Sequence, residues 1–291
     1  MKKIAIILTL CLVIVSLIAC NSAPPAAAEQ AAEQVAERTG QAAQQAVSQQ
    51  TAAQQDNDKN DLWILAVGVN QYQNNQYYPN LSFAVSDAKN IIGAFQSQRG
   101  NAYNNVNTLL IADSADKRPT RDNIYSGMDF LMDAQPNDTV IVFIASHRII
   151  QDGVYYIMPS DSRYVRDSFD PASMIPFDDI LKMMLPSKAL VILDTHAPES
   201  AIEIANEKNI AILGACAVNE QARESHDYAG GLLTISIMEA FSSVVNSENQ
   251  ITLGDLYTYV RNRVNFMSGN AQNPFLHAPS HSIHTVIGLR Q

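Results

Sequence analysis

The stretch LWILAVGV, Leu62 to Val69, is a run of eight apolar residues without a charged side chain. Continuous rather than alternating hydrophobicity is typical of a strand that is covered on both faces, as in a parallel sheet. Similar runs follow along the chain: VNTLLIA (106–112), DTVIVFIAS (138–146), ALVILDT (189–195) and NIAILGACA (209–217). We therefore expect Leu62–Val69 to be one of several buried strands of one sheet.

Segments with helical periodicity separate these runs. Apolar residues recur at helical spacing between 81 and 95, and Thr120 precedes RDNIYSGMDFLMDA as a helix cap. We expect a hairpin at GVYYIMP, two helices at roughly 229–245 and 252–267, and a last strand at SIHTVIG. Such alternation predicts an α/β fold, a mainly parallel sheet of about six strands wrapped by helices on both faces.

The first residues have the pattern of an export signal rather than of a folded domain. A basic start is followed by IAIILTLCLVIVSLIA and then by Cys20. This resembles the lipobox of bacterial lipoproteins, which implies removal of residues 1–19 and acylation of Cys20. An uncleaved membrane anchor and an ordinary signal peptide are the alternatives. Two or three acyl chains would give stable attachment to a lipid bilayer.

Residues 20–60 form an Ala/Gln-rich segment in which large apolar side chains are nearly absent. Such a composition cannot bury enough surface to fold alone, so we expect a partly helical tether, with a coiled coil as an alternative. Asn21 is not Asp, which favours the periplasmic face of the outer membrane over the inner membrane in a Gram-negative host. Residues 61–291 then form the folded domain.

The charge balance, 19 basic against 29 acidic residues, shows no cluster of Lys or Arg. Nucleic acid is therefore not an expected partner. Cys11 leaves with the signal and Cys20 carries lipid, so Cys216 is the one free thiol expected in the mature chain. No disulfide framework and no cofactor are expected.

Residues whose side chains can take part in catalysis or binding lie where the predicted strands end. These ends are Gly68-Val69-Asn70, Ser146-His147-Arg148, Asp194-Thr195-His196 and Cys216. In a doubly wound sheet, sites form beyond the carboxyl ends of the strands. Two histidines, a carboxylate and a thiol are therefore candidates for one site.

Several short segments, in order and spacing, resemble the caspase-like cysteine peptidases, especially the bacterial metacaspase (orthocaspase) branch. They are LAVGVNQY, LSFAVSDAKNI, RDNI, PNDTVIVFIASH, DGVYYIMPSD, KALVILDT, ACAVNEQARES, ITLGDLYTYV and QNPF. The resemblance covers nearly all of the chain from Trp63 onward. It implies a caspase-like three-layer αβα sandwich.

The resemblance also assigns the catalytic positions. In that family the third strand ends in Gly-His-Gly and the fourth in Asp-x-Cys-His-x-Gly. His147 matches the general-base histidine, but Ser146 and Arg148 replace the two glycines. His196 occupies the position of the nucleophilic cysteine, and Pro198 lies in the turn that follows.

These departures are unfavourable to proteolysis. The family mechanism needs a thiolate nucleophile and backbone N–H groups that approach the oxyanion closely. His196 supplies no sulfur, and the β-carbon of Arg148 obstructs that approach. We therefore expect a peptidase homologue, a pseudoprotease, that no longer cuts peptides.

Two alternatives keep a reaction or a metal at the site. Cys216 would act as a displaced nucleophile in an active cysteine-type endopeptidase that cleaves after Arg or Lys. Alternatively, His147 and His196 would bind zinc or copper together with Glu199 or Cys216, although no tight ligand spacing supports this. The preferred interpretation has no metal.

Acidic residues implied by the resemblance indicate a ligand. In the metacaspase branch such residues line the specificity pocket, and Asp87 and Asp194 match two of these positions. Carboxylates there would pair with the guanidinium or ammonium group of a substrate. Glu224 is a weaker match, with a surface charge as its alternative. We expect a binding or regulatory module for basic peptide segments.

Overall fold

The computed structural model describes residues 60–184, 188–196, 201–217, 219–244 and 249–290. Contacts divide the chain into two units, Met1–Asp58 and Lys59–Gln291, and every described residue belongs to the second. The predicted signal peptide, Cys20 and nearly all of the tether lie outside the described residues. No helix in the described part of the chain has both the length and the apolar character needed to cross a bilayer.

The central sheet has six strands in the order β14-β10-β9-β3-β1-β2. The strands from β10 to β2 in this order pair in parallel, and β14 runs antiparallel to β10 at the edge. The strands are β1 (Leu62–Gly68), β2 (Val106–Ala112), β3 (Thr139–Ala145), β9 (Lys188–His196), β10 (Ile210–Cys216) and β14 (Phe275–His277). The predicted mainly parallel sheet is confirmed.

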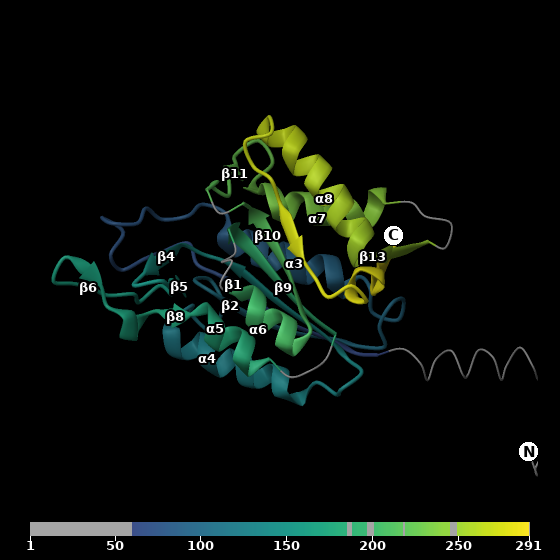
Figure 1. Cartoon of the computed structure of the whole chain (residues 1–291), viewed down its shortest axis with the longest axis horizontal. Helices are drawn as coiled ribbons and strands as arrows, with labels where there is room; N and C mark the ends of the chain where they lie inside the picture. Colours follow the sequence, from purple (N-terminus) through teal and green to yellow (C-terminus); the bar gives the residue numbers. More distant parts are fainter. Residues whose placement is uncertain (1–59, 185–187, 197–200, 218, 245–248, 291) are drawn as a thin grey trace, which may run out of the picture. The chain divides into compact units, whose positions relative to one another are not determined.

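Helices cover both faces of this sheet (Figure 1). One layer consists of α3 (Ala84–Gln96), α7 (Leu232–Ser243) and α8 (Leu253–Ser268), and the other of α4 (Arg121–Phe130), α5 (Phe177–Met183) and α6 (Ala201–Lys208). Alternate residues of β1 enter different cores: Leu65 and Val67 pack with α4, α5 and α6, whereas Ile64 and Ala66 pack with α3, α7 and α8. Burial on both faces explains the continuous apolar run, and the three-layer α/β fold is confirmed.

The end of the chain differs from the sequence prediction. SIHTVIG was expected to form one last strand, which is wrong for its first half, because Ser282–His284 (η3) is a 3₁₀ turn. Val286–Leu289 (β15) pairs with β13 (Gln250–Thr252) outside the central sheet. The sixth strand is β14 instead, a three-residue segment too short to carry an alternation pattern.

Short elements surround the carboxyl ends of the strands. Two small sheets follow β3, and a hairpin with two residues in each strand precedes α7 (Figure 1). They comprise β4 (Arg148–Gln151), β5 (Val154–Ile157), β8 (Ile175–Pro176), β6 (Tyr164–Val165), β7 (Ser168–Phe169), β11 (Glu224–Ser225) and β12 (Gly230–Gly231). Two further 3₁₀ turns are η1 (Leu131–Asp133) and η2 (Pro171–Ser173). The predicted hairpin at GVYYIMP is confirmed as the second strand of β4–β5.

Candidate functional site

A cleft of about 520 Å³ lies beyond the carboxyl ends of β3 and β9. Its lining includes Asp87, His147, Arg148, Asp194 and Glu224. The structure therefore brings together the sequence-predicted histidine and all three sequence-predicted acids. The volume is within the range of pockets that hold small ligands, roughly 300–1,000 Å³.

His147 is held in one orientation by the loop that follows β1. Its Nε2 lies 2.7 Å from the carbonyl oxygen of Pro79, and because a carbonyl only accepts, Nε2 donates this hydrogen bond. The backbone N–H of His147 donates to the hydroxyl of Tyr72 at 2.8 Å. The rings of Tyr72 and Tyr78 lie close to the imidazole, with centroids 4.9 and 5.0 Å from it.

The imidazole is prepared to accept a proton. Burial lowers the pKa of His147, which favours the neutral ring at neutral pH. With the proton on Nε2, the lone pair of Nδ1 is the basic position. This matches the general-base role that the resemblance implied, although a base alone does not open a peptide bond.

Asp87 and Asp194 form the acidic part of the cleft around Gly231. The backbone N–H of Gly231 donates to both carboxylate oxygens of Asp87, at 3.2 and 3.1 Å. The hydroxyl of Thr234 donates to Oδ2 of Asp194 at 3.0 Å. Asp87 is only 2% exposed, so the alternative of a solvated helix carboxylate is wrong for this residue.

The two carboxyl groups hold protons more strongly than ordinary aspartates. Burial is the largest cause that raises the pKa of Asp87, and the charge of Asp194 raises it further. Burial also raises the pKa of Asp194, and the nearby charge of Glu224 adds to this. No ion pair joins either carboxyl to a basic side chain among the described residues. A cation in the cleft would therefore relieve an unfavourable concentration of negative charge.

Close packing at the end of β1 places Asp87 in the cleft. A β-carbon on Gly68 would lie 2.3 Å from the carbonyl oxygen of Ala84, so only glycine permits the start of α3 to approach this strand. Asp87 is in the first turn of α3, where the helix dipole favours a negative charge. The position of the acid is thus a consequence of helix–strand packing.

Glu224 acts from the loop before α7 on the start of α3. Its carboxylate accepts hydrogen bonds from the backbone N–H groups of Ser82 and Phe83, at 3.0 and 2.8 Å. Phe83 is the N-cap of α3 and makes no side-chain cap of its own. Glu224 also pairs with Gly231 in the β11–β12 hairpin. It therefore ties the loop to the helix and adds negative charge beside the cleft.

His196 is the last residue of β9, and its Cα pairs with that of Cys216 in β10. Its backbone is thus at the carboxyl edge of the sheet, next to the strand that leads to His147. The structure describes no side chain at 196, and Ala197 to Ser200 lie outside the described residues. The metal hypothesis needs His196 together with Glu199 or Cys216, so it too depends on side chains outside the described part of the chain. Elsewhere in the described chain, no group of three metal-ligating side chains is present.

Cys216 has the properties of a core residue rather than of a nucleophile. Its side chain is fully buried, and no cysteine is among the described residues that line the cleft. Burial raises the pKa of its thiol to about 12, whereas an activated cysteine needs a lowered pKa. These findings weigh against the alternative in which Cys216 replaces the missing nucleophile.

The residues that orient the site were not predicted from the sequence. Pro79 and Tyr72 fix His147, while Gly231 and Thr234 bind the two acids. Gly230-Gly231 before a helix was a detectable signal for close backbone approach. The role of Pro79 left no signal, because only its carbonyl is used.

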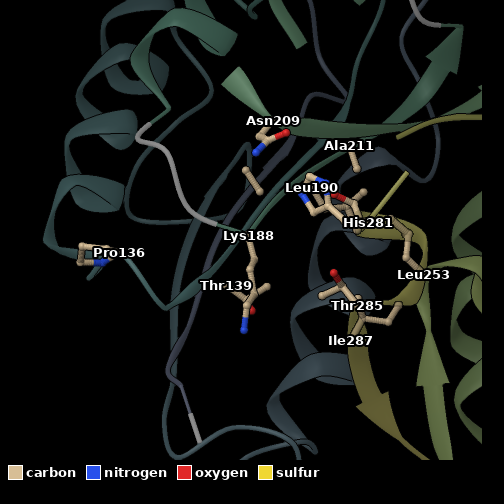
Figure 2. Close-up of a pocket in the computed structure, with 12 residues that line it drawn as sticks. Pro136, Thr139, Lys188, Leu190, Asn209, Ala211, Leu253, His281, Thr285 and Ile287 are labelled. Carbon is tan, nitrogen blue, oxygen red and sulfur yellow. The ribbon is translucent and has the colours of Figure 1, made fainter. Parts of the chain in front are cut away.

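A second hollow, of about 290 Å³, lies at the opposite edge of the sheet. Figure 2 shows Thr139 and Lys188, at the starts of β3 and β9, across this hollow from Thr285 and Ile287 of the C-terminal segment. It contains none of the predicted site residues. Sites in open α/β sheets form beyond the carboxyl ends of the strands, so the acidic cleft remains the candidate site.

The fold and the site define a three-layer α/β protein with a histidine and two acids around a cleft beyond the strand ends. The chain matches the peptidase C14 family, described as the caspase domain, over residues 61–282. It belongs to this family.

A crystal structure of a protein from Geobacter sulfurreducens is similar, with a TM-score of 0.54 and 11% sequence identity, over 79% of this chain and 99% of that chain. At this identity the likeness shows the fold alone. No curated protein matches the chain.

Proposed function

We propose that this chain is a cell-envelope lipoprotein whose caspase-like domain binds basic peptide segments without cleaving them. The observation that carries the proposal is the pair of carboxyl groups, Asp87 and Asp194, that faces Gly231 in the cleft beside His147. The proposed ligand is a peptide that places one Arg or Lys side chain between these acids.

The chemistry of the cleft supports a cationic ligand. Two carboxyls with raised pKa values lack a basic partner among the described residues. A guanidinium group has N–H donors spaced to bind carboxylates in pairs, and such charge-assisted hydrogen bonds are stronger than neutral ones. We therefore expect Arg to bind more tightly than Lys, and a neutral isostere to bind weakly.

The absence of cleavage is supported by the two positions where a thiol would have to act. His196 occupies the nucleophile position implied by the family resemblance, and Cys216 is buried with a raised pKa. His147 retains the arrangement of a base, but a base without a nucleophile leaves amide hydrolysis slow by several orders of magnitude.

The cellular setting follows from the N-terminal segment. Acylated Cys20 would attach the chain to a bilayer, and residues 21–60 would hold the domain away from it. A domain that binds but does not cut is suited to regulate or deliver a basic partner at the envelope. The periplasmic face of the outer membrane is the proposed location in a Gram-negative host.

Titration calorimetry of the acylated full-length chain in detergent micelles tests binding. The ligands are matched peptides that contain one Arg, one Lys or one citrulline, the neutral isostere of Arg. We expect the order Arg, Lys, citrulline, with a loss of at least about 10-fold in affinity for Arg in Asp87→Asn or Asp194→Asn. Asp129→Asn, which removes an exposed carboxylate of α4, is the matched control.

Mass spectrometry of the peptides after titration tests cleavage. Intact peptides together with Arg-selective binding support the proposal. Equal affinity for Arg and citrulline would refute recognition of the cation. Turnover that His147→Ala abolishes would instead establish an active peptidase.

A further inference from the structure

Arg148 places a positive charge in the same cleft as the acidic pair. It follows His147 directly, begins β4 and lines the cleft together with Asp87 and Asp194. In the family pattern this position is a glycine, so the guanidinium is an addition of this chain. The cleft therefore contains both signs of charge.

Charges of both signs act on residues around the strand ends. The pKa of the Cys216 thiol is raised mainly by burial, and it is further raised by the charge of Asp194 and lowered by that of Arg148. Arg148 also lowers the pKa of Tyr78, which burial raises, on the His147 side of the cleft. Arg148 and Asp194 thus both act on the region where β9 and β10 end.

Arg148 does not neutralise the acids. Burial and neighbouring carboxylates raise the pKa of Asp87 and Asp194, and Arg148 is not among the main charges that act on either carboxyl. Arg148 has contacts of its own in the domain, and it lines the cleft together with both acids. One ligand with two opposite charges would therefore meet both the acidic and the basic parts of the cleft.

A C-terminal Arg or Lys residue carries these two charges on one amino acid. Its side chain is a cation, and its α-carboxylate is an anion a few bonds away. In an internal Arg, the same backbone position is a neutral peptide carbonyl, which gains less from a guanidinium. Arg is the side chain best suited to bind a carboxylate through paired hydrogen bonds.

We propose that the cleft recognises peptides that end in Arg or Lys, with the side chain at Asp87 and Asp194 and the free carboxylate at Arg148. This inference rests on the proposed function and specifies its ligand. Such peptides are the products of cleavage after basic residues. The domain would thus bind what an active peptidase of that specificity releases.

Titration calorimetry with four peptides of otherwise equal sequence tests the inference on the acylated full-length chain. One ends in Arg with a free carboxylate, one in Arg-amide, one in citrulline with a free carboxylate, and one has Arg followed by Asp-amide. We expect the Arg acid to bind at least about 10-fold more tightly than the amide. Mass spectrometry verifies that the amide stays intact.

Arg148→Gln is expected to reduce the difference between acid and amide to less than about 2-fold. Arg261→Gln, which removes an exposed guanidinium of α8, should retain the wild-type difference. The comparison of acid with amide on the wild-type chain needs no variant, so it decides the matter even if Arg148→Gln does not fold.

The outcomes separate the two proposals. Equal binding of acid and amide, both tighter than citrulline, overturns recognition of the C-terminus and leaves cation binding standing. Tighter binding of the Arg-Asp peptide than of the Arg acid also overturns it, in favour of an internal basic-acidic pair. Equal binding of Arg and citrulline acids overturns the proposed function itself.

Discussion

Asp87 of α3 and Asp194 of β9 direct their carboxyl groups at the same glycine. A β-carbon on Gly231 would lie 2.3 Å from Oδ2 of Asp194 and 3.1 Å from Oδ2 of Asp87. The acidic pair thus depends on a residue without a side chain. The backbone of Gly231 lies against both carboxyl groups, and its N–H group donates hydrogen bonds to Asp87.

Gly231→Ala is expected to disrupt the acidic pair. The φ angle of Gly231 is −69°, which alanine adopts without strain, so the added methyl acts only through its contacts. Overpacking of this kind costs about 1–3 kcal/mol of unfolding free energy. We expect that loss in urea unfolding, and an affinity for an Arg peptide that falls at least about 10-fold.

Gly93→Ala is the matched control for that substitution. A β-carbon at Gly93 of α3 would meet nothing within 4 Å. It should leave affinity unchanged and stabilise the helix by about 0.5–1 kcal/mol. Wild-type affinity in Gly231→Ala would show that the ligand does not reach the two aspartates.

The acidic pair should make stability fall as the pH rises. Burial raises the native pKa of Asp87 and Asp194, whereas an unfolded aspartate titrates near 3.9. Between these values the native state holds more protons than the unfolded state, so the free energy of unfolding decreases with pH. Below about pH 4 the contribution is fully present, and it is lost as pH passes the native values.

Urea unfolding of wild type and Asp194→Asn between pH 5 and pH 8.5 measures this effect. We expect the wild type to lose on the order of 1–3 kcal/mol more than the variant over this range. Asp129→Asn, an exposed site, should follow the wild-type profile. Parallel profiles for all three proteins would contradict the raised pKa values.

Cys216 should be inert in the folded chain. Its thiol is buried in β10 and its pKa is raised to about 12, so little thiolate forms at neutral pH. Alkylation by iodoacetamide at pH 7 should be at least about 100-fold slower than in the urea-unfolded chain. Rapid alkylation of the native protein, blocked by an Arg peptide, would revive the displaced-nucleophile hypothesis.

The sequence was sufficient for the five parallel strands of the sheet, because their burial on two faces leaves continuous apolar runs. It was not sufficient for α5 and α6, which were missed. α6 has eight residues and α5 seven, and such short segments show little periodicity. β14 was missed for the same reason, since three residues at an edge are held by pairing with β10 rather than by their own pattern.

The residues of the candidate site were predictable where their side chains line the cleft. His147, Asp87 and Asp194 were found by their types and places at the strand ends or by family resemblance, and the cleft contains all three. Groups that act through the backbone, such as the carbonyl of Pro79 and the N–H of Gly231, leave almost no mark in a sequence. The backbone contacts that support the site were therefore visible only in the structure.

Removal of the Glu224 carboxylate should loosen the start of α3. Two backbone N–H groups that lack an intrahelical partner lose their acceptor, at a cost of about 1–2 kcal/mol in Glu224→Ala. Glu224→Gln keeps one oxygen and should lose less. Hydrogen exchange at Ser82 and Phe83 should accelerate, whereas Glu207→Ala, at an exposed position of α6, should leave it unchanged. Equal exchange in all variants would show that the loop and the helix are not coupled.

His196→Cys is expected to restore a reactive thiol but not efficient proteolysis. Residue 196 ends β9 beside β3, which leads to His147. Burial lowers the pKa of His147, and its Nε2 donates to Pro79, so Nδ1 is the position that can accept a proton. A cysteine at this position should be alkylated by an Arg chloromethyl ketone, detected as a mass increase. His147→Ala in the same background should slow the labelling, because the base that forms the thiolate is lost.

Hydrolysis by that variant should remain weak as long as Arg148 is present. The β-carbon and guanidinium of Arg148 stand where the family pattern has a glycine whose N–H approaches the oxyanion. Addition of Arg148→Gly should therefore raise turnover of an Arg peptide by up to about 100- to 1,000-fold, the typical effect of a single oxyanion donor. If His196→Cys alone cut peptides at the rate of the double variant, Arg148 would not obstruct catalysis.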